Sequence, residues 1–300
     1  MPQLFDIQET KSCSLSECVE ALGDMGFDTR DEASAKATAH LLKRLANNRE
    51  FLGDILIRQL ESQYRTDSVE SGYGPQAIVL SPLREGTFLR ANIWSSEQDH
   101  CYQASGAKSF VYGIPHDHNF SFLTAGYLGP GYQSDYFEYD YESVAGYAGE
   151  ICELKFVERT ALHEGKLMLY RAHKDIHSQI APDSLSVSLN VMKVGTAQSW
   201  YDQYGFDLDQ SRVEKVLSPN STEVFLRVAI ATRHEGALDL AEQFGRHHPS
   251  DRLRLASFEA RSLLCVDQVE RDALWREAEL SGSRMLAGAA LMQRRHLEPA

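Results

Sequence analysis

The sequence predicts an α+β protein in which a β-rich domain is flanked on both sides by helical segments. Apolar residues recur at three- and four-residue spacings over 14–65, which indicates helices. Short runs of β-branched and aromatic residues follow over 76–194, each bounded by Gly, Pro or Ser, and helical spacing returns after 220. These patterns divide the chain into an N-terminal helical segment (1–72), a β-barrel domain (73–205) and a C-terminal helical segment (215–300).

The first helical segment carries recognisable start and stop signals. Ser14 is a candidate N-cap and Glu17 stands three residues later, which is the spacing of a capping box. A second helical pattern begins near Asp31, and Asn47 and Asn48 are expected to interrupt it.

The central domain reads as a series of short strands. In the clearest one, 184–194, Val187, Leu189 and Val191 alternate with small polar residues such as Ser188 and Asn190, which predicts a half-buried strand with one small polar face. Many short strands at this spacing are typical of a barrel or a sandwich. The other predicted strands are QAIVLSPL, TFLRANIWS, SDYFEYDYES, GEICELKFVER and KLMLYRAH.

The C-terminal segment is expected to hold about four helices. Pro249 and Ser250 read as a helix start and Gly282 as a break. Two helix pairs of similar length favour HEAT-like stacking, although no firm repeat is found. These helices are expected to cover the barrel or to form the surface of a homodimer.

Composition excludes several function classes. The formal net charge of −13 disfavours binding to nucleic acid or to anionic membranes, because both carry negative charge. No apolar run is long enough to span a bilayer, and the N-terminus lacks a basic segment followed by an apolar stretch. Five scattered cysteines without a CxxC pair fit reduced thiols, so we expect a cytoplasmic protein.

Histidines are concentrated in the β-domain. His116 and His118 stand two residues apart, and on an extended segment such residues project to the same side while the intervening Asp117 points away. A third ligand has to come from a distant strand, and His177 is the first candidate, with His173 left open as its rival. Three neutral imidazoles suit Fe(II), Mn(II), Ni(II), Cu or Zn.

These residues carry a family resemblance. "PHDHNFSFLTAGYLG" and "IHSQIAPDSLSVSLNV", together with Gly113 and Gly165, resemble the two motifs of the cupin superfamily. The three-histidine group typified by cysteine dioxygenase is the most similar subtype. The resemblance covers about 80–195 and implies a double-stranded β-helix barrel with a metal in its mouth, held by His116, His118 and His177. It further implies Fe(II) and reaction with O2.

The chain departs from that family at instructive positions. Ser121 and Phe122 occupy the place of the usual cupin glutamate, which agrees with a three-histidine site or leaves Glu138 as a fourth ligand. Where the thiol dioxygenases carry a serine and a histidine on the last strand, this chain has Ser188 and Asn190. A changed set of groups behind the ligands implies a different substrate from cysteine.

Three residues are the predicted catalytic groups. Arg90, within the apolar stretch "FLRANIW", is suited to clamp a carboxylate, and Ser188 and Asn190 are placed by the resemblance. The predicted function is a non-heme Fe(II) oxygenase, an oxidoreductase acting on a small polar molecule such as an amino acid derivative. Two alternatives remain open at this stage: a non-catalytic ligand-binding or regulatory cupin, and a cupin isomerase or lyase that uses Mn, Ni or Zn.

Overall fold

A computed structural model describes residues 2–65, 76–195, 198, 200–218 and 220–297. Their contacts form two compact units, the first made of Met1–Tyr139 and Leu154–Ser199, the second of Asp140–Glu153 and Trp200–Ala300. The three-segment division made from the sequence stays a prediction, and residues 1 and 66–72 of its first segment lie outside the described residues.

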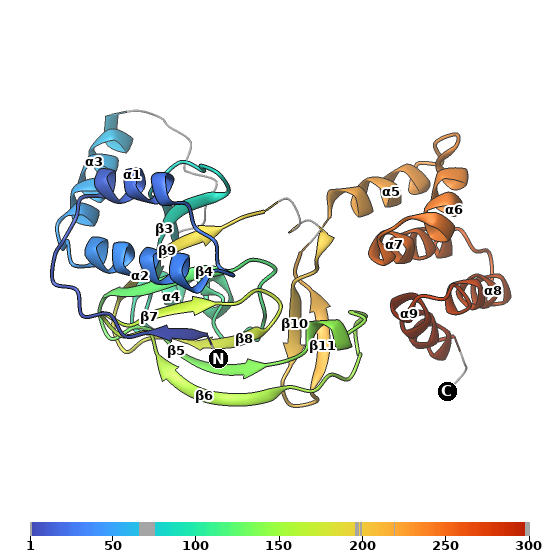
Figure 1. Cartoon of the computed structure of the whole chain (residues 1–300). Coiled ribbons are helices and arrows are strands. Elements are labelled where there is room, and N and C mark those ends of the chain that lie inside the picture. The colour runs from blue at the N-terminus through green and yellow to red at the C-terminus, as the bar shows by residue number, and fades with distance from the viewer. Residues whose placement is uncertain (1, 66–75, 196–197, 199, 219, 298–300) are drawn as a thin grey trace. The chain divides into compact units, whose positions relative to one another are not determined.

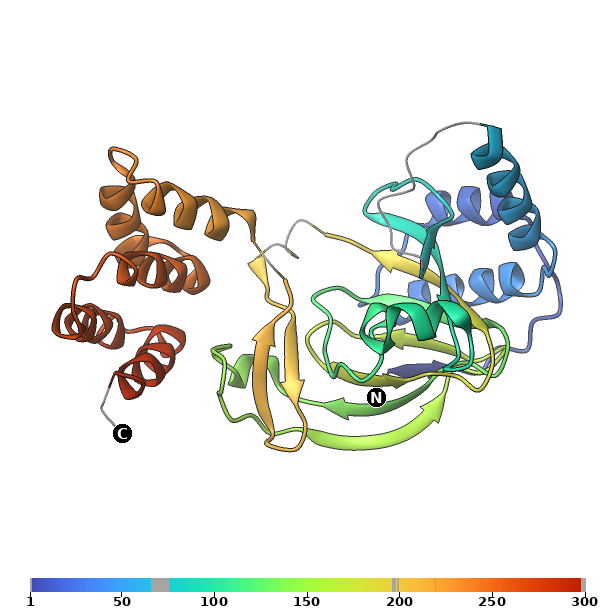
Figure 2. The same ribbon diagram turned by 180° about the vertical axis from the view of Figure 1, so that it is seen from behind.

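The first unit contains two antiparallel sheets (Figures 1 and 2). The larger has the strand order β1-β7-β4-β9-β3-β2, and the smaller has the order β6-β5-β8. The predicted combination of helices and antiparallel strands is confirmed. In the described part of the chain no closed ring of strands joins the two sheets, so the predicted barrel stays a prediction. The strands are β1 (Gln3–Phe5), β2 (Ala77–Val79), β3 (Thr87–Trp94), β4 (Phe122–Leu128), β5 (Gln133–Glu138), β6 (Lys155–Ala161), β7 (Leu167–Tyr170), β8 (Asp175–Ile180) and β9 (Ser186–Lys193).

Helices α1 (Leu15–Met25), α2 (Glu32–Ala46) and α3 (Phe51–Arg65) belong to the same unit, and α1 and α2 lie along one face of the larger sheet (Figure 1). The capping box predicted for Ser14 and Glu17 is present, and a break separates α2 from α3 after Ala46 as predicted. Asn47 fixes that break because its side-chain amide donates to the carbonyl of Glu9 at 2.8 Å.

The larger sheet has two chemically different faces. Leu189 of β9 and Leu123 of β4 pack with α1 and α2 in an outer apolar cluster. The alternate residues face the smaller sheet, where Met192 joins Trp94 and Tyr170 in an inner, largely aromatic cluster. The alternation predicted for 184–194 is therefore confirmed, with β9 beginning at Ser186. The prediction that the strand is half-buried is wrong, because the polar face that carries Ser188 and Asn190 is buried as well, against the smaller sheet.

Two shorter helical pieces, α4 (His100–Ser105) and the 3-10 turn η1 (Ala107–Phe110), connect β3 to the histidine segment. The sequence did not predict them. Phe110 belongs to the inner cluster, and the partly buried Tyr102 packs against it.

The second unit combines a β-hairpin with helices. Strands β10 (Tyr204–Asp207) and β11 (Arg212–Val216) pair antiparallel, and an inserted segment around Ile151 bridges to Arg212. The hairpin was not predicted. Five helices follow where about four were expected, and a short connection at Thr232–Gly236 separates the first two. They are α5 (Ser221–Ala231), α6 (Ala237–His247), α7 (Asp251–Ser262), α8 (Gln268–Glu279) and α9 (Arg284–Arg295), and the 3-10 turn η2 (Tyr141–Ser143) belongs to the same unit.

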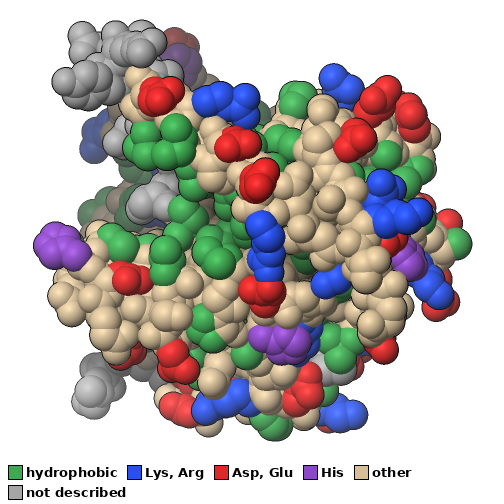
Figure 3. Space-filling model, turned by 90° about the vertical axis from the view of Figure 1, so that its left-hand side faces the viewer, with side chains coloured by type: hydrophobic (Ala, Val, Ile, Leu, Met, Phe, Trp, Pro, Cys, Tyr) green, Lys and Arg blue, Asp and Glu red, His purple; other side chains and the backbone are tan. Residues whose placement is uncertain are grey.

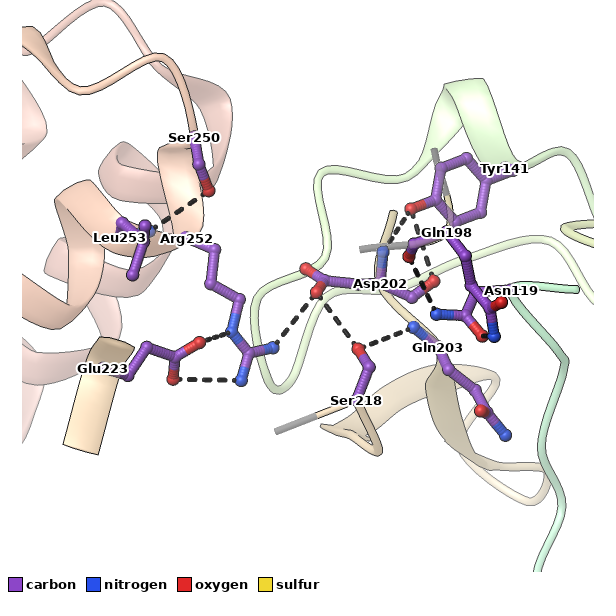
Figure 4. A network of polar contacts seen from close by, with 10 residues as sticks. All are labelled: Asn119, Tyr141, Gln198, Asp202, Gln203, Ser218, Glu223, Ser250, Arg252 and Leu253. Atoms are coloured by element: carbon purple, nitrogen blue, oxygen red, sulfur yellow. Dashed lines mark hydrogen bonds and ion pairs between the residues drawn. The ribbon is translucent and has the colours of Figure 1, made fainter. Parts of the chain in front are cut away.

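Ser250 caps α7 and Gly282 lies between α8 and α9, as predicted. Arg252 of α7 ties the helices to the hairpin (Figure 4). Its guanidinium donates to Glu223 of α5 at 2.5 and 3.2 Å and lies 3.4 Å from Asp202, next to β10.

On the side that carries α1–α3, acidic and basic side chains are interspersed among apolar ones, and the described side chains form no continuous basic area there (Figure 3). Among the described residues, no helix has both the length and the apolar character needed to cross a bilayer.

Candidate metal centre

The backbone brings the two histidine motifs together. His177 lies in the middle of β8, opposite Tyr136 of β5. On the other side of β8, His116 pairs with His177 through two backbone hydrogen bonds of 3.0 and 2.9 Å. Gly113 starts this contact in the left-handed region, at φ 68°, and donates to the carbonyl of Gln179 at 2.9 Å. Residues 113–118 therefore run along the edge of β8 as an added antiparallel segment.

Three imidazoles converge at this edge. The ligand atoms of His116, His118 and His177 all lie within 4.8 Å of one another. The Nε2 atom of His177 is 3.0 Å from Nε2 of His118 and 3.1 Å from Nε2 of His116. Two nitrogens bound at right angles to one metal, each at about 2.1 Å, would be about 3.0 Å apart. The spacing of these two pairs thus fits ligands to one divalent ion.

The tautomer of His116 also fits a metal. Its Nδ1–H donates to the carbonyl of Ile114 at 2.7 Å, so Nε2 carries the lone pair that faces the other two rings. The Nδ1 atoms of His118 and His177 are buried and have no hydrogen-bond partner among the described residues. The three Nε2 atoms cannot all be paired with one another. A nitrogen of a neutral imidazole carries either one hydrogen or one lone pair, so it can take part in only one N–H···N hydrogen bond, and one of the three is left without a partner. A shared cation satisfies all three.

Electrostatics keep the three rings neutral. Burial lowers the pKa of His116, partly opposed by its hydrogen bond to Ile114. Burial also holds the pKa values of His118 and His177 well below the usual range, and the neighbouring imidazoles lower them further. Neutral imidazole is the form that binds metals.

Aromatic rings enclose the centre. The His118 ring lies 5.0 Å from both Phe120 and Phe122, with Phe122 edge-on at 89°. Tyr170 stacks on Phe122 and its ring centroid is 5.0 Å from that of His177. These ring contacts restrict the orientation of the His118 and His177 imidazoles.

The two other candidate ligands, His173 and Glu138, lie outside the convergent group. His173 is not part of the convergent group; its backbone is left-handed at φ 60°, and its N–H donates to the carbonyl of His118 at 2.9 Å. Glu138 is also outside the group, and its carboxylate accepts from Arg171 at 2.8 Å.

The predicted catalytic residues face the inner cluster from the larger sheet. Arg90 of β3 pairs in register with Asn190 of β9, and its charge is close enough to lower the pKa of His118. Asn190 is buried and donates to the carbonyl of Arg90 at 3.5 Å. Ser188, two residues along β9, accepts from the indole N–H of Trp94 at 3.0 Å.

Two features near the centre were missed by sequence reasoning. Asp117 is fully buried, and its carboxylate accepts a 2.6 Å hydrogen bond from the Tyr139 hydroxyl. The hydroxyls of Tyr132, Tyr136 and Tyr170 meet in a phenol cluster beside the histidines. The sequence showed an aromatic-rich stretch here but gave no signal that these hydroxyls converge.

No family model matches the chain, and no curated protein matches it. Solved structures similar to it include a putative mannose-6-phosphate isomerase from Ralstonia eutropha JMP134, at 14% identity over 43% of this chain and 93% of that chain, with a TM-score of 0.22. Others are a structure from a study of DMSP lyases (11% identity, 68% and 84% covered, TM-score 0.27) and one of prolyl 4-hydroxylases from Phytophthora capsici (10%, 93% and 83%, 0.25). At these scores the likeness is too slight to assign a fold family.

Proposed function

We propose that this protein is a metal-dependent enzyme of the cupin type, and specifically an Fe(II) oxygenase that acts on a small polar molecule such as an amino acid derivative. The observation that carries the proposal is the convergence of three imidazole Nε2 atoms from two distant segments of the chain, two of them on buried histidines and the third on the partly buried His118. The two facing antiparallel sheets supply a setting in which a cupin-type site can form.

His116, His118 and His177 would hold the ion through Nε2. When bound, iron supplies open positions for substrate and O2 and transfers electrons between them, which suits hydroxylation, dioxygenation or oxidative cleavage. The remaining steps belong to the protein. Arg90 binds a substrate carboxylate through its planar, two-pronged guanidinium.

Neighbouring groups orient the substrate and keep the site dry. Asn190 and Ser188 present polar atoms on the same face of the sheet as Arg90. Phe120 and Phe122 exclude water from the His118 side of the centre. Exclusion of water strengthens the charge interactions between the substrate and Arg90.

The first test is metal content. Protein purified without added metal should contain about one divalent ion per chain by mass spectrometry of the metal, matching a single three-ligand site. His177→Ala should lose it, and His173→Ala, which removes a nearby histidine outside the convergent group, should keep it. Retention of the ion in His177→Ala would refute the site.

The second test concerns the reaction. A cupin isomerase or lyase using Mn, Ni or Zn is served equally well by the three histidines, and it would turn over without oxygen. The Fe(II) protein is therefore assayed for O2 uptake with a panel of free and N-acylated amino acids. Product that forms equally fast under nitrogen contradicts the oxygenase proposal and favours the isomerase or lyase. Ligand-dependent stabilisation without any product favours a binding protein.

A further inference from the structure

The three hydroxyl groups of the phenol cluster are not needed to pack the interior. The Tyr170 hydroxyl lies 3.0 Å from the Tyr132 hydroxyl and 2.8 Å from that of Tyr136, and all three rings are buried. Taking a hydroxyl out of water is costly, and replacing a hydrogen-bonded pair by apolar groups of the same shape is often neutral. Phenylalanine would fill this space, so the hydroxyls call for a chemical explanation.

The cluster continues as a chain of aromatic rings. Trp94 lies against Tyr132, with 4.2 Å between ring centroids. Tyr112 is 6.1 Å from Trp94, and Tyr102 is 5.9 Å from Tyr112. Every member of this chain is a tyrosine or a tryptophan, the two aromatic side chains that lose an electron most readily.

The two ends of the chain lie in different surroundings. At the inner end, the Tyr170 ring is 5.0 Å from His177 and 6.2 Å from His118, two of the proposed metal ligands. At the outer end, Tyr102 is partly exposed and follows the exposed thiol of Cys101. The chain thus connects the proposed centre with solvent.

We propose that Tyr170, Tyr132, Trp94, Tyr112 and Tyr102 form an aromatic path that carries one-electron oxidation from the metal centre to the surface. Its role is to protect the histidine ligands when the metal reacts with peroxide in the absence of substrate. This inference rests on the proposed function, since it needs a redox-active ion at the three histidines.

The chemistry balances with two co-reactants, hydrogen peroxide and a small external thiol. Ferrous iron held by His116, His118 and His177 would supply one electron to peroxide, which yields hydroxide and a hydroxyl radical and leaves the iron ferric. The radical takes a hydrogen atom from the Tyr170 hydroxyl, which gives water and a phenoxyl radical. Tyr132 then passes its own hydrogen atom across the hydroxyl–hydroxyl contact to Tyr170.

The later steps move the same one-electron oxidation outward. Trp94 gives the Tyr132 radical one electron and, from its indole N–H, one proton, which restores the Tyr132 phenol and leaves a neutral tryptophan radical; the two ring centroids are 4.2 Å apart. Tyr112 and then Tyr102 repair the preceding radical in the same way, each giving up one electron and one proton. At the surface the external thiol gives a hydrogen atom to Tyr102, and two such thiyl radicals combine as a disulfide.

The experiment compares Trp94→Phe with Trp275→Phe. Trp275 is a matched control because it is also buried but lies in α8, in the other unit. Each protein is loaded with Fe(II) and exposed to hydrogen peroxide without substrate, and peptide mass spectrometry measures oxidation at every residue. Trp94→Phe should show severalfold more oxidation of His118 and His177 and a matching loss at Tyr102.

Tyr132→Phe provides a second test that changes only one oxygen atom. It should give the same redistribution, because the Tyr170 radical can no longer take a hydrogen atom from residue 132. If iron binds and the oxidation pattern is the same in Trp94→Phe, Tyr132→Phe and the control, the path is refuted while the metal site stands. If no iron binds to the wild type, the proposed function and the path are both overturned, and the metal content alone reveals this.

Discussion

The hydrogen bond between Tyr139 and Asp117 gives the sharpest test of how the fold supports the histidines. Asp117 is fully buried between His116 and His118, and the Tyr139 hydroxyl is 2.6 Å from its carboxylate. A hydrogen bond to a charged group contributes about 1.5–3 kcal/mol, against about 1 kcal/mol for a neutral one. Tyr139→Phe should therefore lower the free energy of unfolding of the first unit by about 2 kcal/mol.

The comparison variant is Tyr127→Phe, because the Tyr127 hydroxyl is also buried but donates to a neutral acceptor, the Asn48 carbonyl, at 3.0 Å. Urea unfolding is followed by the fluorescence of Trp94 in a chain whose other two tryptophans, both in the second unit, are changed to phenylalanine. Equal losses in the two variants would refute the reasoning.

The same pair predicts an effect on the metal. Loss of a group that orients a ligand typically costs about 10–100-fold in metal affinity. Tyr139→Phe should weaken binding of a divalent ion by this amount, measured by competition with a chelator, because Asp117 fixes the backbone between His116 and His118. Tyr127→Phe should leave the affinity unchanged. A normal affinity in Tyr139→Phe would show that Asp117 does not position the ligands.

Three further predictions follow from the described contacts. A divalent ion at 100 times its dissociation constant should stabilise the protein by about 2.7 kcal/mol in thermal unfolding, and should not stabilise His177→Ala. Arg252→Met leaves the carboxylates of Glu223 and Asp202 without their cation, which should destabilise the second unit by about 3–5 kcal/mol, with Arg252→Lys intermediate. The loss of unfolding free energy in Arg252→Met, relative to the wild type, should become smaller as the pH falls. Burial already raises the pKa of Asp202 above its value in the unfolded chain, and loss of the Arg252 charge raises that pKa further. The folded variant then binds more protons than the unfolded chain, so its stability rises as the pH falls through the folded pKa toward the unfolded one, which urea unfolding at several pH values can check.

Local signals predicted much of the fold. The capping box at Ser14 depends on residues three apart, and the two faces of β9 depend on a period of two, so both can be read within one segment. The β10–β11 hairpin was missed because its strands are short and its polar turn, 208–211, resembles any loop. Hairpins of this kind are fixed by pairing across the turn, which composition does not reveal.

The candidate site was likewise predictable where it depends on local spacing and not where it depends on strand pairing. The spacing of His116 and His118 predicted that both rings point to one side, since that is a local property of extended chain. The choice between His173 and His177 could not be made from spacing, because it depends on the pairing of β8 with residues 113–118. The phenol cluster joins β5 with β7, and no local pattern indicates that contact.

The two faces of the larger sheet explain how such a polar site is tolerated in a folded interior. Asn190 and Ser188 alternate with Leu189 and Val191, which are almost completely buried in the outer apolar cluster. Each large apolar side chain contributes about 1.5–3 kcal/mol on burial, which offsets the cost of the polar groups on the opposite face. The outer face therefore fixes the strand, and the inner face is left to hold chemically useful groups whose own burial is unfavourable. Three neutral imidazoles facing one another are an extreme case of that cost, and a bound cation is what would remove it.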